Sequence, residues 1–172
     1  MDVTTRLAAV DDAPALAAQL RANRDFLAPW EPARSDEYFT DDGQRQVLAD
    51  MLRQWADGTT LPHVIVADGE VVGRIALTNI ARGPFQSGQL GYWVAAKVNG
   101  RGVATAAVAD VVRTAFGALG LHRIEAGTLV HNVASQRVLE RNGFQRYGLA
   151  PRYLRIAGGW RDHVLFQRLS DD

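Results

Sequence analysis

One stretch decides how this sequence folds: Tyr92-Trp93-Val94-Ala95-Ala96-Lys97-Val98-Asn99-Gly100-Arg101-Gly102-Val103-Ala104-Thr105. Its aromatic, apolar beginning predicts a strand, and its end opens a segment with apolar residues at helical spacing. Gly100 and Gly102 stand between the two, and without a Cβ their backbone can turn sharply and lie close to a ligand. The free N–H groups of a helix's first turn, together with the positive end of its dipole, favour a phosphate. The stretch therefore predicts either an anion-binding turn or a plain strand-to-helix connection.

Two familiar nucleotide-binding motifs do not match this turn. A dinucleotide fingerprint needs a third glycine, and Thr105 stands at that position. No Gly-Lys-Ser or Gly-Lys-Thr is present, which excludes a nucleoside triphosphate P-loop.

The rest of the chain alternates strands and helices around this turn. Strands are expected at residues 3–10, 63–67, 71–77, 90–94, 123–130, 145–156 and 160–169. Helices are expected after Asp11 or Asp12, from Asp41 or Asp42 to Gly58, after Gly102 and over 132–142, with a loop over 26–39. Asp68-Gly69 and Gly158-Gly159 predict tight hairpin turns. The order β-α-α-β-β-β-α-β-α-β-β predicts an α/β fold, a mixed sheet with helices on both faces, in one domain over residues 1–172.

Composition narrows the class of protein. Hydrophobic residues make up 47% and charged residues 22% of the 172, as in ordinary globular domains. The 19 basic and 19 acidic residues cancel, which argues against a protein that coats nucleic acid or an anionic membrane. The absence of cysteine excludes disulfides, thiolate nucleophiles and zinc–thiolate sites. No apolar run approaches ~18 residues, and Asp11-Asp12 interrupts the N-terminal apolar stretch, so we expect neither a membrane span nor a signal peptide and a cytoplasmic location.

The glycine turn resembles a known signature. Asn99-Gly100-Arg101-Gly102-Val103-Ala104 is similar to the Gln/Arg-x-x-Gly-x-Gly/Ala signature of the GNAT N-acetyltransferases, with Asn99 in place of the usual Gln or Arg. Other segments resemble the RimJ/RimL branch, which contains ribosomal-protein N-terminal acetyltransferases: Asn23-Arg24, Trp30-Glu31-Pro32, Asn79, Arg82-Gly83, Leu90-Gly91-Tyr92, His122-Arg123-Ile124, His131-Asn132, Gly143-Phe144 and Trp160-Arg161-Asp162-His163-Val164-Leu165. This likeness covers nearly the whole chain and implies a mostly antiparallel central sheet whose middle strands splay apart.

The resemblance also implies acetyl-CoA as cosubstrate and no metal. The pyrophosphate of acetyl-CoA would lie on the turn and the first helical residues, namely Asn99, Gly100, Arg101, Gly102, Val103, Ala104 and Thr105. Its pantetheine arm would follow the strand at Tyr92, Trp93 and Val94. Asn132 would contact that arm, although an asparagine at this place also fits a simple helix cap.

Acetyl transfer to an amine needs a neutral amine, a polarised carbonyl and a proton for the departing sulfur. Ser135 lies one helical turn after Asn132 and is the candidate donor to the sulfur, since Leu139 stands where many GNAT enzymes carry a tyrosine. Glu31 is the candidate base, with a solvated loop carboxylate as the alternative interpretation. The four histidines are too scattered for a metal site. Side chains expected at the mouth of the acceptor site are Trp30, Arg82, Phe85 and Tyr92.

These observations predict an acetyl-CoA-dependent N-acetyltransferase that acts by direct attack in a ternary complex. A protein N-terminal α-amine, in a ribosomal protein for example, is the expected acceptor because it titrates near ~8, whereas a lysine titrates near ~10.4. Two alternatives stay open: an enzyme that acetylates a small amine such as an amino acid, polyamine or antibiotic, and a non-catalytic module that senses acetyl-CoA. No direct binding of nucleic acid is expected; a homodimer is considered as a partner, but the sequence does not give the oligomeric state.

Overall fold

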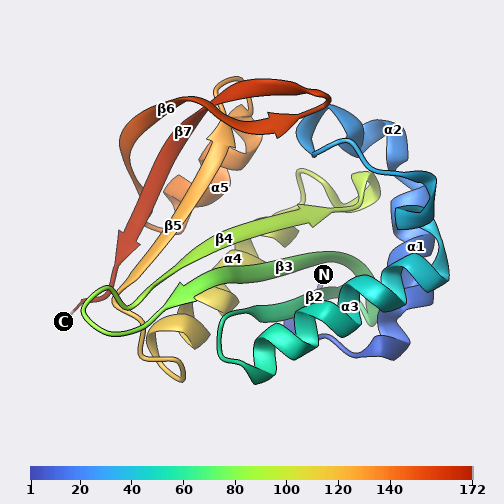
Figure 1. Cartoon of the computed structure of the whole chain (residues 1–172), viewed down its shortest axis with the longest axis horizontal. Coiled ribbons are helices and arrows are strands. Elements are labelled where there is room, and N and C mark those ends of the chain that lie inside the picture. Colours follow the sequence, from blue (N-terminus) through green and yellow to red (C-terminus); the bar gives the residue numbers. More distant parts are fainter. Residues whose placement is uncertain (172) are drawn as a thin grey trace.

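The computed structural model describes residues 1–171 and contains one seven-stranded sheet of order β1-β2-β3-β4-β5-β7-β6 (Figure 1). The strands are β1 (Val3–Leu7), β2 (Leu61–Ala67), β3 (Glu70–Ala81), β4 (Ser87–Val94), β5 (Arg123–Leu129), β6 (Gln145–Ile156) and β7 (Gly159–Leu169). The α-helices are α1 (Ala13–Ala22), α2 (Arg24–Leu27), α3 (Asp41–Ala56), α4 (Val103–Phe116) and α5 (Val133–Arg141). Short 3-10 turns are η1 (Val10–Asp12), η2 (Ala28–Trp30), η3 (Asp36–Phe39) and η4 (Ala96–Val98). This arrangement confirms the mixed α/β sheet.

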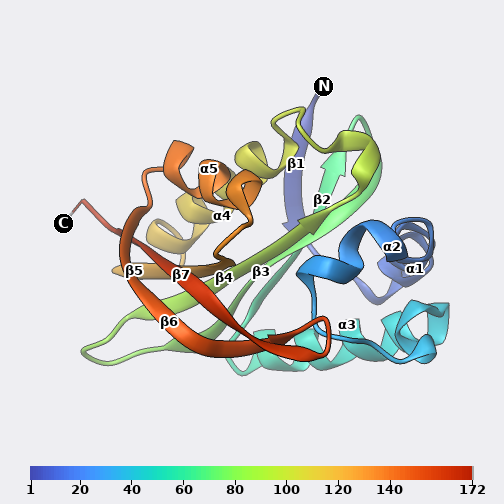
Figure 2. The same cartoon turned by 90° about the horizontal axis from the view of Figure 1, so that it is seen from above.

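Helices cover both faces of the sheet, as Figure 2 shows: α4 and α5 lie on one side, and α1, α2 and α3 on the other. The alternation of strand residues explains the two layers, since successive side chains point to opposite faces. Ile75 and Leu77 of β3 are fully buried in the core that contains α4. Trp93 of β4 packs instead in the core that contains Leu16 of α1 and Leu48 of α3.

Two tight turns organise the hairpins. Asp68 and Gly69 have φ values of 49° and 83°, as a two-residue turn between antiparallel strands requires, so the predicted β2–β3 hairpin is confirmed. The β6–β7 turn lies at Ala157 and Gly158, with φ values of 48° and 79°, one residue earlier than predicted. At this tip the Ala157 N–H donates to the backbone oxygen of Glu31 at 2.9 Å, which joins the β6–β7 hairpin to the segment after η2.

The middle of the sheet is split. β4 pairs with β3 along most of its length, but its parallel pairing with β5 covers only Ser87 to Gln89. Beyond Gln89 the two strands diverge, which is plain in Figure 1. The edge of β4 from Leu90 to Val94 therefore faces an opening and not a neighbouring strand. The expected splayed central strands are confirmed.

The N-terminal region differs from the prediction. β1 ends at Leu7 and not at residue 10, because the Asp12 carboxylate accepts from the Ala9 N–H at 2.8 Å and from Arg6 at 2.7 Å, which turns the chain into η1. The segment 26–39, predicted as a loop, contains the end of α2 together with η2 and η3. No helix within residues 1–171 has the length and apolar character needed to span a bilayer.

Candidate active site

The glycine turn before α4 is open to a ligand. Gly100 and Gly102 have φ values of 74° and 81°, the left-handed conformation that glycine adopts without strain. A Cβ placed on either glycine would meet no atom of residues 1–171 within 4 Å. Gly102 is the N-cap residue of α4 and offers no side-chain cap, so the N–H groups of the first turn are free to bind an anion. The turn fits the diphosphate of acetyl-CoA.

A buried asparagine holds the segment that leads to this turn. The Asn23 side-chain oxygen accepts from the Ala96 N–H at 2.8 Å, and its amide nitrogen donates to the Gln19 oxygen at 2.7 Å. Asn23 is 7% exposed, so both bonds are shielded from water. The end of α1 therefore fixes the path of the chain between β4 and α4.

Two hydroxyl groups connect β4 with α5 beside the opening. The Tyr92 hydroxyl lies 2.8 Å from that of Ser135 in α5. Asn132 caps α5, because its side-chain oxygen accepts from the Ser135 N–H at 3.1 Å. Burial raises the pKa of Tyr92 to about 12, although the Ser135 hydrogen bond acts in the opposite direction. Tyr92 is therefore protonated at neutral pH and able to donate a hydrogen bond through this pair.

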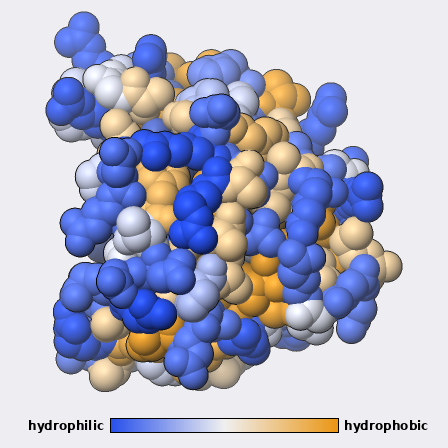
Figure 3. All heavy atoms as spheres, turned by 90° about the vertical axis from the view of Figure 1, so that its right-hand side faces the viewer, coloured by the Kyte–Doolittle hydropathy of each residue, from blue (hydrophilic) through white to orange (hydrophobic). Residues whose placement is uncertain are grey.

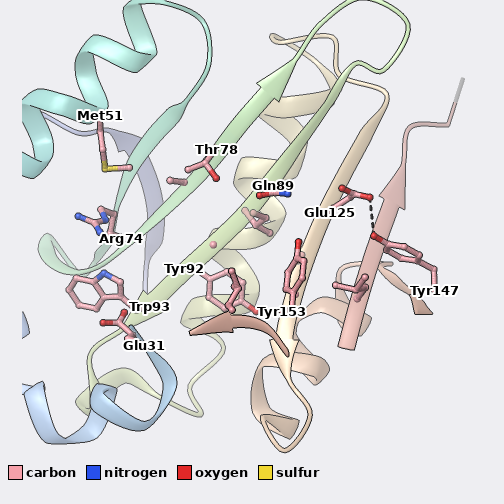
Figure 4. A pocket seen from close by; sticks show the side chains of 17 residues that line it. Glu31, Met51, Arg74, Thr78, Gln89, Tyr92, Trp93, Glu125, Tyr147 and Tyr153 are labelled. Atoms are coloured by element: carbon pink, nitrogen blue, oxygen red, sulfur yellow. Dashed lines mark hydrogen bonds between the residues drawn. The ribbon is translucent and has the colours of Figure 1, made fainter. Parts of the chain in front are cut away.

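A cavity of about 370 Å³ lies against β4. Its lining residues come from α3, β3, β4, β5, β6, β7 and the segment after η2, and Figure 4 shows them around a common space. Gly91 forms part of the lining, and a Cβ placed there would meet no described atom within 4 Å. Tyr92 also lines the cavity, so the Tyr92–Ser135 pair and the cavity meet at the same residues of β4.

Glu31 reaches this cavity from the segment after η2. Burial raises the pKa of the Glu31 carboxyl, and the positive charges of Arg34 and Arg74 oppose that shift. Arg74 lies opposite Trp93 in the β3–β4 ladder, and Figure 4 shows Arg74, Trp93 and Glu31 at the same end of the cavity. A carboxylate whose pKa lies closer to neutrality accepts a proton more readily, which suits a general base.

The structure does not bring every predicted residue to the cavity. Arg82 and Phe85 lie at the β3–β4 turn, at the opposite end of β4 from Trp93. Arg82 donates to the Leu119 oxygen at 2.6 Å, and Phe85 is 54% exposed; neither lines the cavity. The prediction that these two residues shape the acceptor mouth therefore disagrees with their positions.

The remaining predicted residues lie around the opening. The Trp30 ring packs against the His131 ring at 5.3 Å, which links η2 to the start of α5. Trp93 and Val94 have buried side chains, so their backbone is what they present to a bound arm. Asn99 is exposed, beside the turn.

Several residues that line the cavity were not predicted from the sequence, among them Arg74, Glu125, Tyr147 and Tyr153. Arg74 had a signal, because it is a charged residue inside the otherwise apolar run from Val71 to Leu77. Tyr147 donates to Glu125 at 3.0 Å, a contact between β6 and β5 that no local pattern contains. Residues 1–171 contain no cluster of three histidine or acidic residues able to hold a metal ion.

Comparison with known proteins places this geometry in context. Residues 2–145 match the family model described as acetyltransferase (GNAT) domain. The [ribosomal protein uS5]-alanine N-acetyltransferase of Escherichia coli is 33% identical over 172 residues, which cover 99% of this chain and 89% of the relative. The structure of ribosomal-protein-S5-alanine acetyltransferase from Vibrio fischeri is 34% identical with a TM-score of 0.94, over 100% and 95% of the two chains. That of RimJ from Mycobacterium smegmatis in complex with CoA-disulfide is 35% identical with a TM-score of 0.95, over 98% and 82%.

Proposed function

Because the chain belongs to the GNAT family of acetyltransferases and uses acetyl-CoA as its acetyl donor, we propose that its acceptor is the N-terminal α-amine of a protein, a ribosomal protein above all. The observation that carries this proposal is the meeting of the β4–β5 opening with the Glu31-lined cavity at Gly91 and Tyr92. One side of β4 offers a path from the α4 turn, and the other offers room for a chain end.

The residues of the turn and opening fit the cosubstrate. The amides from Gly100 to Thr105 would hold its diphosphate, and the open edge of β4 would pair with the amide groups of its pantetheine arm. Bound there, acetyl-CoA supplies an activated acyl group on a sulfur that can leave. A free backbone N–H at the edge of β4 would polarise the acyl oxygen.

Glu31 is the group in the cavity that can remove the acceptor's proton. Its pKa is raised by burial, and an α-amine titrates near ~8, so little free energy is needed to bring the amine to its neutral form. A lysine side chain titrates about 2.4 units higher, which would cost roughly 3 kcal/mol more at the same pH. The site therefore favours an α-amine over a lysine.

The Tyr92–Ser135 pair serves the departing sulfur. A serine hydroxyl is too weak an acid to give up its proton alone, but here it shares a 2.8 Å hydrogen bond with a tyrosine that stays protonated. Ser135 would donate to the negative charge that develops on sulfur, and Tyr92 would support that donation. Asn132 orients the serine through the cap of α5.

A thiol-release assay tests the proposal against its alternatives. Acetyl-CoA is supplied with short peptides that have free N-termini, with polyamines, with aminoglycosides or with free amino acids. We expect release of CoA above hydrolysis with peptides. Turnover restricted to small amines would support a small-molecule acetyltransferase, and tight acetyl-CoA binding without turnover would support a sensor.

Two further expectations accompany this proposal. A ribosomal-protein acceptor would place the enzyme in the cytoplasm, where such proteins are made. A homodimer remains a prediction that a sedimentation measurement would test.

A further inference from the structure

Two buried donors at one end of the cavity have no partner in the protein. Among residues 1–171, four buried side-chain polar atoms lack a hydrogen bond, and two of them are Arg74 Nη1 and Trp93 Nε1. Both residues line the cavity, and Trp93 is 7% exposed. They are direct neighbours in the β3–β4 ladder, so their side chains stand on the same face of the sheet. Buried donors without a partner are unfavourable, which points to an acceptor atom supplied by a ligand.

The charge of Arg74 is also uncompensated at close range. Its one hydrogen bond goes to the Tyr38 hydroxyl, a neutral group, at a long 3.3 Å. Within the described part of the chain no carboxylate lies within 4.0 Å of its guanidinium, and Glu31 influences it only at longer range. Glu125, which also lines the cavity, is by contrast paired with Arg123 at 2.8 Å.

We propose that Arg74 and Trp93 bind a carboxylate of the acceptor, an acidic side chain within the first few residues behind the N-terminal amine. This inference rests on the proposed function. An arginine fork matches a carboxylate with two parallel hydrogen bonds, and the indole N–H adds a third donor. When the acceptor ammonium approaches Glu31, its positive charge neutralises the charge of that carboxylate. The positive charge of the Arg74 guanidinium is then left without a counter-charge. A carboxylate restores the balance of charge, whereas a peptide carbonyl would not.

The surface around the site agrees with recognition inside the cavity. The face that carries α1 and α2 mixes charged and apolar side chains, so both kinds of group border the site (Figure 3). A few residues at the end of a chain, read by charge, fit this surface.

The test compares matched peptides that carry Asp or Asn at the second or third position. With the wild-type enzyme we expect kcat/KM to be at least ~10-fold higher for Asp at the preferred position. Arg74→Gln should remove this preference, Arg74→Lys should keep part of it, and Trp93→Phe should weaken it while preserving the packing. Arg45→Gln is the control, since Arg45 is an exposed residue of α3 that pairs with Asp42 and does not line the cavity.

Each outcome decides the matter. Equal rates for Asp and Asn peptides with the wild-type enzyme overturn the acidic preference while N-terminal acetylation stands, and this comparison needs no variant to fold. A preference that survives in a folded Arg74→Gln enzyme overturns the role of Arg74. Arg74-dependent acetylation of free amino acids, with no peptide acetylated, places the carboxylate on the amino acid itself and overturns both the proposed function and the side-chain source.

Discussion

Substitution of Gly102 by Asp tests whether the turn before α4 binds the diphosphate of acetyl-CoA. Gly102 has φ of 81°, and a Cβ there would contact no described atom within 4 Å. Asp tolerates the left-handed conformation better than most residues, at a strain of roughly 1 kcal/mol, and it is a favourable N-cap residue. We therefore expect Gly102→Asp to fold with only a small loss of stability.

The loss of binding follows from charge. Two like unit charges about 4 Å apart repel by roughly 1 kcal/mol in water and by roughly 4 kcal/mol near a protein surface. Since about 1.4 kcal/mol corresponds to a factor of ten, Gly102→Asp should weaken CoA at least ~10-fold. Calorimetry with CoA measures this directly.

Gly58→Asp provides the matched control. Gly58 has φ of 77° and equally open space, but it follows α3, away from the α4 turn. It should lose at least as much stability as Gly102→Asp, because a carboxylate at the C-terminus of a helix is unfavourable, without the loss of CoA affinity. Unchanged CoA affinity in folded Gly102→Asp would refute the reasoning and leave the turn a structural connection only.

Three more predictions concern the chemistry and the stability of the fold. Tyr92→Phe and Ser135→Ala should each lower kcat by about 10-fold or more with little change in the KM for acetyl-CoA. The double variant should lose less than the product of the two single losses, because the two hydroxyls share one hydrogen bond. If the pair only positions the pantetheine arm, steady-state kinetics would show an effect on KM alone. Glu31→Gln should lower the kcat/KM plateau by about 100-fold. In the wild type, kcat should fall as pH drops through the raised pKa of Glu31, and the variant should lose this acidic limb. An unchanged pH profile would exclude Glu31 as the base. The hydrogen bonds from Arg6 and the Ala9 N–H lower the pKa of Asp12, so its contribution to the free energy of unfolding is present above the unfolded pKa of ~3.9 and is lost as pH falls through the folded pKa. In urea unfolding, Asp12→Asn should lower the free energy of unfolding by about 1–2 kcal/mol at pH 7 and by less towards pH 3. A loss that does not depend on pH would contradict this prediction.

The sequence was most informative where function or folding depends on local backbone geometry. The strand, the two glycines and the helix from Tyr92 to Thr105 are confirmed as β4, the turn and α4. Asp68-Gly69 gave the first hairpin, because a two-residue turn requires positive φ at both positions. Such features depend on only a few neighbouring residues, so they can be predicted from the sequence without knowledge of the tertiary fold.

Contacts between elements far apart in the chain could not be predicted from the sequence. Tyr92 and Ser135 lie 43 positions apart and meet only because the tertiary fold brings α5 to the part of β4 that β5 leaves unpaired. Phe85 was misplaced for a related reason: it precedes β4, and a strand of eight residues spans roughly 25 Å, which puts it at the far end from Trp93. The order of residues along a strand gave their separation, but not which end of the strand borders the cavity.

The most direct test of the central claim is to locate the acetyl group on an acceptor peptide by mass spectrometry. The peptide carries a small N-terminal residue, an acidic second and third residue and one internal lysine, and a matched peptide has its N-terminus blocked. The account predicts a single acetyl group on the N-terminal nitrogen of the free peptide and none on the blocked one. Efficient acetylation of the lysine in the blocked peptide would contradict it.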